Sequence, residues 1–174
     1  MRGANPGEAR TAFLTPLRRA VSCVSPTVLI AARTGPAGAE SWSTADDVVR
    51  VKSAVGDLQL RLQQAFCVAE DPAAPSRALR WEVALTGYEY QVLAGDGEVA
   101  WHWHPWSTNR EPHLHVSAGP LAGVHLPSGP VGLEAVLRVL IGELGVSALR
   151  EDWEQVLAAG AVPPQQWRRR PTPP

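Results

Sequence analysis

Tryptophan and histidine alternate over residues 101–104, at the end of the segment 98–104, and this alternation constrains the fold more than any other part of the sequence. Side chains on a β-strand point to opposite faces in turn, so Trp101 and Trp103 are expected on one face of a sheet. His102 and His104 are then expected on the other face. The sequence therefore predicts a strand with one face packed in a core and one polar face.

A second strand with the same pattern is predicted over residues 113–117, where His113 and His115 share one face. Only residues 105–112 separate the two segments, so we expect them to pair as an antiparallel hairpin. The histidines of both strands then lie on one face. Directly opposed side chains would have Cβ atoms about 5 Å apart and diagonal ones about 7–8 Å apart.

Other patterns predict the elements around this hairpin. Residues 81–92 alternate like a strand, with a change of phase at Gly87 that predicts a bulge. Gly95 to Gly97 predict a tight turn. Broad apolar stripes predict helices over residues 132–144 and 149–159.

An amphipathic helix is also predicted from Ser43 to Phe66. Ser43 and Thr44 are good helix caps. Apolar residues then recur at intervals of three and four, at Val48, Val51, Val55, Leu58, Leu62 and Phe66. A helix, three strands and two further helices predict an α+β fold, with an antiparallel β-meander of three or more strands packed on one face by amphipathic helices.

The chain has 174 residues and 45% hydrophobic content, which fits one domain, expected over residues 42–162. Residues 1–41 are rich in Gly, Pro, Ala and Arg without a sustained period, and are predicted to be a disordered or non-native N-terminal extension. Residues 163–174 are predicted to be a disordered Pro/Arg tail. No apolar run reaches the length of a membrane span, so we expect a cytoplasmic protein without a membrane partner.

Charge is unevenly distributed along the chain. Residues 42–164 carry eight basic and fifteen acidic residues, a balance of −7 (8 − 15), whereas the whole chain carries −1. This sign disfavours nucleic acid as a partner, because such binding depends on neutralising phosphates. The two cysteines form no CxxC pair, which argues against a thiolate zinc site.

The imidazole face allows metal chemistry. Three imidazoles from a His-x-His strand and its neighbour can hold zinc with a position open for water, which supports hydrolysis near pH 7. The expected metal ligands are His102, His104, His113 and His115. Glu111, in the loop between the strands, could be a further ligand or a base, so the candidate catalytic residues are His113, His115 and Glu111.

The same face allows other functions. Without a metal, the imidazoles could act as acid and base, or bind phosphate when protonated, with Arg110 holding an anionic group. A plainer alternative is an ordinary solvated face opposite a tryptophan-packed one. The residues alone leave open a metal-binding protein such as a hydrolase, a metal-free site and a non-enzymatic interaction domain.

Several motifs in this order resemble a group of His-rich α+β proteins from actinobacteria. They cover about residues 42–160, at Tyr88-x-Tyr90, Trp101–Pro105, Pro112–His115, His125–Gly129 and Val131–Leu137. More remotely, residues 88–145 resemble the TumE-type toxins of bacterial toxin–antitoxin pairs, which place a Pro-His-x-His strand before a leucine-rich helix opening with Leu-Glu-x-Val.

The resemblance to TumE-type toxins implies a function and a partner. It implies a toxin, or a derivative of one, that binds a cognate antitoxin protein and acts on nucleic acid or translation. His113, His115 and Glu134 occupy the matching motif positions. The chain is longer than that pattern, and His102 and His104 are additions to it.

Overall fold

The computed structural model describes residues 1–34 and 39–160. Within them, nine strands form one antiparallel sheet in the order β2-β3-β5-β6-β7-β8-β9, with β1 paired to β6 and β4 paired to β5. The strands are β1 (Arg2–Gly3), β2 (Leu29–Arg33), β3 (Ala39–Thr44), β4 (Val49–Ser53), β5 (Gly56–Glu70), β6 (Trp81–Ala94), β7 (Gly97–Trp103), β8 (His113–Val116) and β9 (His125–Pro127).

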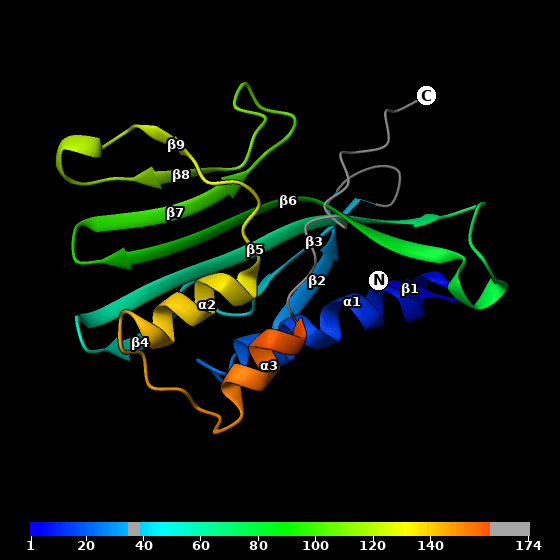
Figure 1. Ribbon diagram of the computed structural model, residues 1–174, viewed down its shortest axis with the longest axis horizontal. Coiled ribbons are helices and arrows are strands. Elements are labelled where there is room, and N and C mark those ends of the chain that lie inside the picture. Colours follow the sequence, from blue (N-terminus) through cyan, green and yellow to red (C-terminus); the bar gives the residue numbers. More distant parts are fainter. Residues whose placement is uncertain (35–38, 161–174) are drawn as a thin grey trace.

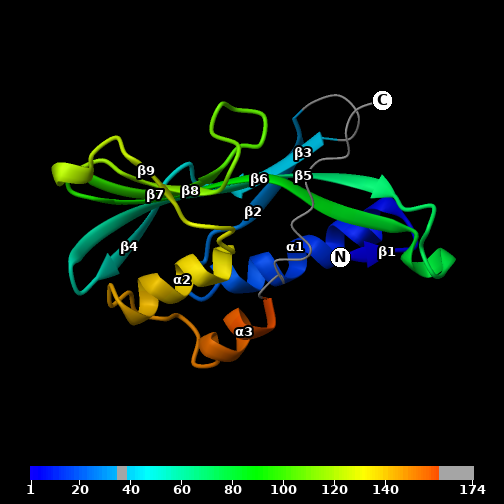
Figure 2. The same ribbon diagram turned by 45° about the horizontal axis from the view of Figure 1, so that its top comes forward.

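The described helices are α1 (Pro6–Val21), α2 (Leu133–Gly142) and α3 (Trp153–Gly160), with short 3-10 turns at Arg77–Leu79 and Gly119–Leu121. Figures 1 and 2 show that the three helices cover the same face of the sheet and leave the other face uncovered. The predicted α+β class and the antiparallel meander packed on one face are confirmed. We call the helix-covered side the inner face and the other side the outer face.

The inner face carries the core. Trp103 is 6% exposed, and Trp101 packs against the core cluster, as the alternation along this strand predicts. Leucines on the helices complete the packing from the other side, including Leu137 and Leu157. None of the helices in the described ranges is long and apolar enough to cross a membrane.

Two long strands, β5 and β6, form the centre of the sheet. Their register shifts between Ala65, which faces Gly87, and Phe66, which faces Leu85. Thr86 is therefore an extra residue in β6, and the bulge predicted beside Gly87 is confirmed.

The prediction of a helix from Ser43 to Phe66 is wrong, because this segment forms the end of β3, all of β4 and most of β5. Leu58, Leu60 and Leu62 are all buried and alternate along β5, but Leu58 and Leu62 also fit a helical interval of four. Gln64 concealed the alternation, since it is a polar residue on the buried face.

The prediction of a disordered stretch over residues 1–41 is also wrong for the described residues, so the folded unit does not begin at residue 42. Asn5 caps α1 by accepting a hydrogen bond from the backbone N–H of Glu8 at 2.9 Å. Phe13 and Leu17 then enter the core. The proline inside α1 and the mixed composition hid this helix, whereas the predicted tail, 163–174, lies outside the described residues.

Candidate metal centre

The outer face brings the histidines of β7 and β8 together. His102 lies directly opposite His113, and His115 lies directly opposite Ala100. Directly opposed residues in an antiparallel pair share a face. Because Trp103, the neighbour of His102, is buried on the inner face, these histidines lie on the outer face.

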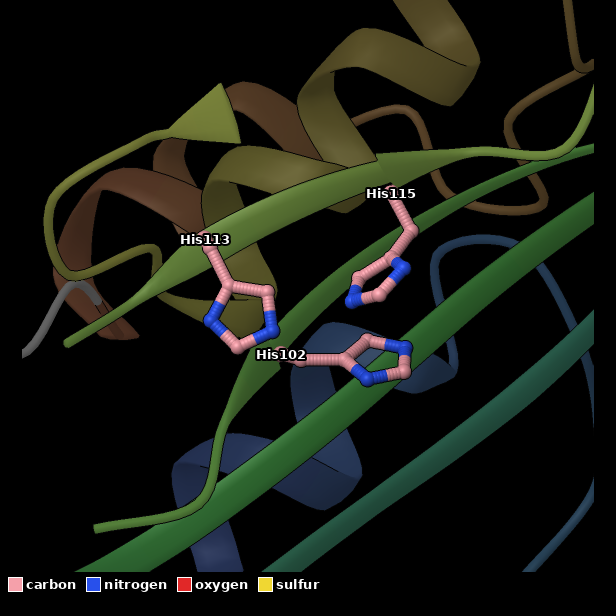
Figure 3. A group of neighbouring side chains, drawn as sticks. All are labelled: His102, His113 and His115. Carbon is pink, nitrogen blue, oxygen red and sulfur yellow. The ribbon is translucent and has the colours of Figure 1, made fainter. Parts of the chain in front are cut away.

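His102, His113 and His115 form a compact group. One ring nitrogen from each lies within 4.8 Å of the others. Figure 3 shows the three rings turned toward one another, two from one strand and one from its neighbour. Zinc bound at about 2.0–2.1 Å by imidazole nitrogens sets them about 3.3 Å apart, so small rotations of these side chains would bring all three to one ion.

His113 has the hydrogen bond that a metal-ligating histidine usually makes. Its Nδ1 lies 2.8 Å from the backbone oxygen of Glu111. A carbonyl oxygen only accepts, so Nδ1 carries a proton, and in the neutral ring the lone pair is then on Nε2. Metal-bound histidines commonly donate their other ring N–H to a carbonyl in this way, which fixes the ring and its tautomer.

One ring nitrogen of His102 lacks a hydrogen-bond partner within the described part of the chain. Its Nε2 is buried and makes no hydrogen bond to the residues that the structure describes. Such atoms are uncommon in folded proteins, and leaving one unpaired costs about 1–3 kcal/mol. Coordination to a metal ion would give this nitrogen a partner.

Burial favours the neutral form of three imidazoles, those of His102, His104 and His115. It lowers the pKa of His102 to about 4, helped by its histidine neighbours and opposed by the negative charge of Glu89. Burial also lowers the pKa of His104 and of His115. These three side chains are therefore unprotonated near pH 7, which suits metal binding and disfavours a protonated site for phosphate.

Glu89 supplies negative charge beside the histidines. Its Oε2 accepts a hydrogen bond from Nε2 of Gln63 at 3.0 Å, and its Oε1 accepts one from Nε2 of Gln91 at 2.7 Å. The Nε2 of His104 lies 3.9 Å from Oε2 of Glu89. The same three polar side chains, Gln63, Glu89 and Gln91, help to line an open hollow of about 420 Å³.

The other predicted site residues lie apart from this group. Arg110 and the side chain of Glu111 are exposed on the loop between β7 and β8, and neither belongs to the set of close ligand atoms. Glu111 instead contributes its backbone oxygen to His113. Glu134 lies in α2, is 3% exposed and is on the inner side, so it does not share a site with the histidines.

His125 is not among the site residues predicted from the sequence, yet it lies beside the group of His102, His113 and His115, and together with His104 these residues form the histidine cluster. His125 lies directly opposite His115 across β8 and β9, with ring centroids 4.2 Å apart. Its ring centroid is 5.0 Å from that of His113. The short segment His125–Pro127 carried too few residues to show a strand pattern, although its position after a loop following residues 113–117 was compatible with one more hairpin.

Relatives give no further information about this cluster. The chain matches no protein-family model, no curated protein and no solved structure. The resemblance to TumE-type toxins therefore stays a prediction.

Proposed function

We propose that this protein binds a divalent transition metal ion on its outer face through His102, His113 and His115, with Zn²⁺ as the best fit. The observation that carries the proposal is the meeting of three ring nitrogens within 4.8 Å of one another. Imidazole is a good donor for zinc and for other late transition metals, and zinc readily adopts tetrahedral sites with nitrogen ligands.

Two features favour a metal site over an ordinary solvated face. His113 is 7% exposed, so it does not serve to solvate the sheet. The hydrogen bond from its Nδ1 to Glu111 turns its Nε2 toward other partners, and Nε2 of His102 has no hydrogen-bond partner among the described residues. Histidines that merely covered a sheet would keep both nitrogens in water.

Three histidines alone would leave one coordination position for water. A zinc ion in such a site supports hydrolysis near neutral pH, because it lowers the pKa of the coordinated water. The fourth ligand thus decides whether the bound metal has only a structural role or takes part in catalysis. A hydrolase is the function that a water in this position would support.

A toxin function remains a second proposal, based on the resemblance of residues 88–145 to TumE-type proteins. His113 and Glu134 lie on opposite sides of the sheet, so a single site cannot use both of them. The proposal predicts that expression of the chain stops bacterial growth, that a cognate antitoxin relieves this effect, and that His113→Ala abolishes it. Normal growth with the intact chain would exclude it.

Isothermal titration of the metal-free protein with zinc sulfate tests metal binding. The proposal predicts one ion per chain, and loss of binding in His113→Ala. His104→Ala is the matched control, since in the histidine cluster the His104 ring contacts that of His102 but is not among the close ligand atoms. Circular dichroism of the metal-free variants checks that both are folded. Unchanged zinc binding by folded His113→Ala would exclude the site.

A further inference from the structure

Tetrahedral coordination sets the distances between the rings of its ligands. When imidazole nitrogens bind zinc at about 2.0–2.1 Å, each ring centroid lies about 3 Å from the ion, and any two centroids lie about 5 Å apart. Four imidazoles around one ion make six such pairs. The cluster on the outer face can be compared with this arrangement pair by pair.

Five of the six pairs among His102, His113, His115 and His125 already lie within about 1 Å of this spacing. The ring centroids are 5.8 Å apart for His102 and His113, 4.7 Å for His102 and His115, and 4.9 Å for His113 and His115. They are 5.0 Å apart for His113 and His125, and 4.2 Å for His115 and His125. Among the described side chains, the pair His102 and His125 is the one without a ring contact.

The rings of His102 and His125 would come into contact if β9 moved toward β7. β9 has three residues and lies at the edge of the sheet, where β8 is its single partner among the described strands. His125 is exposed. Gly123 and Gly129 flank β9 with φ of 77° and 67°, a conformation that glycine adopts without strain.

His104 does not fit the same arrangement. Within the histidine cluster its ring contacts His102, at 5.5 Å, but none of the other three. Its other neighbours are Trp106, at 5.8 Å between ring centroids, and the carboxylate of Glu89. His104 was an expected ligand from the sequence, and its position on the far side of His102 argues for a different role.

We infer that His125 is the fourth ligand, so that the metal-loaded site is a closed four-histidine centre in which β9 folds over the ion. This inference rests on the proposed function, since it requires metal binding by the other three histidines. Four imidazoles leave no position for water. The centre therefore holds Zn²⁺, or an ion of similar preference such as Co²⁺, and does not hydrolyse a substrate.

Cobalt and azide test this inference in the full chain. Co²⁺ replaces zinc in such sites and has visible absorption bands that report its ligands, and azide binds to Co²⁺ where a position is open. We expect that azide leaves the bands of the wild-type protein unchanged. His125→Ala should bind Co²⁺ about tenfold more weakly or worse, and azide should now shift its bands.

His104→Ala is the matched control and should behave like the wild type in both measurements. If azide shifts the bands of the wild type as strongly as those of His125→Ala, and both bind Co²⁺ equally, His125 is not a ligand and the site is open. The proposed function then still stands. If the wild type binds neither Co²⁺ nor Zn²⁺, both the proposed function and this inference fail.

Discussion

His102 and His113 face each other directly across β7 and β8, with ring centroids 5.8 Å apart. The candidate site depends on this register, because a shift of one residue would turn the histidines of the shifted strand to the inner face. The tryptophans on the inner face of β7 oppose such a shift, since it would bring them to the solvent. Packing on one face thus fixes the ligand geometry on the other.

Replacing Glu89 tests the electrostatics of the site. Its carboxylate is fixed by Gln63 and Gln91 and raises the pKa of the nearby imidazoles, so it should also attract a bound cation. We expect Glu89→Gln to weaken zinc binding about threefold to tenfold, measured by titration at low salt. Glu98 lies on the outer face of the neighbouring strand β7. The variant Glu98→Gln is the control and should change the zinc affinity less. Equal affinities for both variants and the wild type would contradict this role.

Gly87 is predicted to be required for packing at the bulge in β6. A Cβ at this position would lie 2.9 Å from the backbone oxygen of Trp103 and 2.9 Å from Cη2 of Trp106. We expect Gly87→Ala to lower the free energy of unfolding by about 1–3 kcal/mol in urea denaturation. In α2, Gly142→Ala meets no atom within 4 Å and should be neutral or stabilising by up to about 1 kcal/mol. A neutral Gly87→Ala would show that the bulge adapts easily.

Much of the hairpin could be predicted because its pattern is local. The alternation of Trp101 and His102 gave the two faces, and the phase change at Gly87 gave the bulge. The error over residues 43–66 has a non-local cause. Gln64 is buried because it accepts a hydrogen bond from Nε1 of Trp42 at 2.8 Å and donates one to the hydroxyl of Tyr90, and neither partner can be recognised from the pattern of this segment.

The histidine cluster was only partly predictable for a similar reason. His125 joins it through the pairing of β8 with β9, a strand too short to show a period. Glu111 was expected to act through its carboxylate, but the contact to His113 comes from its backbone oxygen, which every residue carries. Contacts of this kind depend on loop conformation and cannot be recognised from the types of residues in the sequence.

Leu17 tests the corrected N-terminal boundary. It lies in α1 and is 2% exposed, so it belongs to the core and not to a loose extension. We expect Leu17→Ala to lower the free energy of unfolding by about 2–5 kcal/mol, measured by urea denaturation. The exposed neighbour Arg18 provides the control, and Arg18→Ala should change stability little. Equal stabilities of the two variants would mean that α1 does not pack as described.

Glu134 should make stability depend on pH. Burial raises the pKa of this carboxyl from 4.5 to about 7, so the folded state holds its proton more tightly than the unfolded state. The stabilisation that the raised pKa provides is fully present below pH 4.5 and is lost as the pH rises through about 7. The loss in the free energy of unfolding is about 3 kcal/mol.

The variant Glu134→Gln removes this titration. We expect it to be more stable than the wild type at pH 8, with the difference shrinking toward pH 5, in urea denaturation at both pH values. Comparing the two proteins isolates Glu134 from His102, whose lowered pKa acts in the opposite direction over an overlapping range. A difference that does not change with pH would show that Glu134 keeps an ordinary pKa in the folded protein.

Diffraction from crystals grown with zinc, recorded at the zinc absorption edge, locates the bound ion. We expect one strong anomalous peak on the outer face, about 2.0–2.1 Å from a ring nitrogen of each of His102, His113 and His115. Crystals that contain zinc but show no peak among these three side chains, or show one held by other residues, would contradict the proposed metal site.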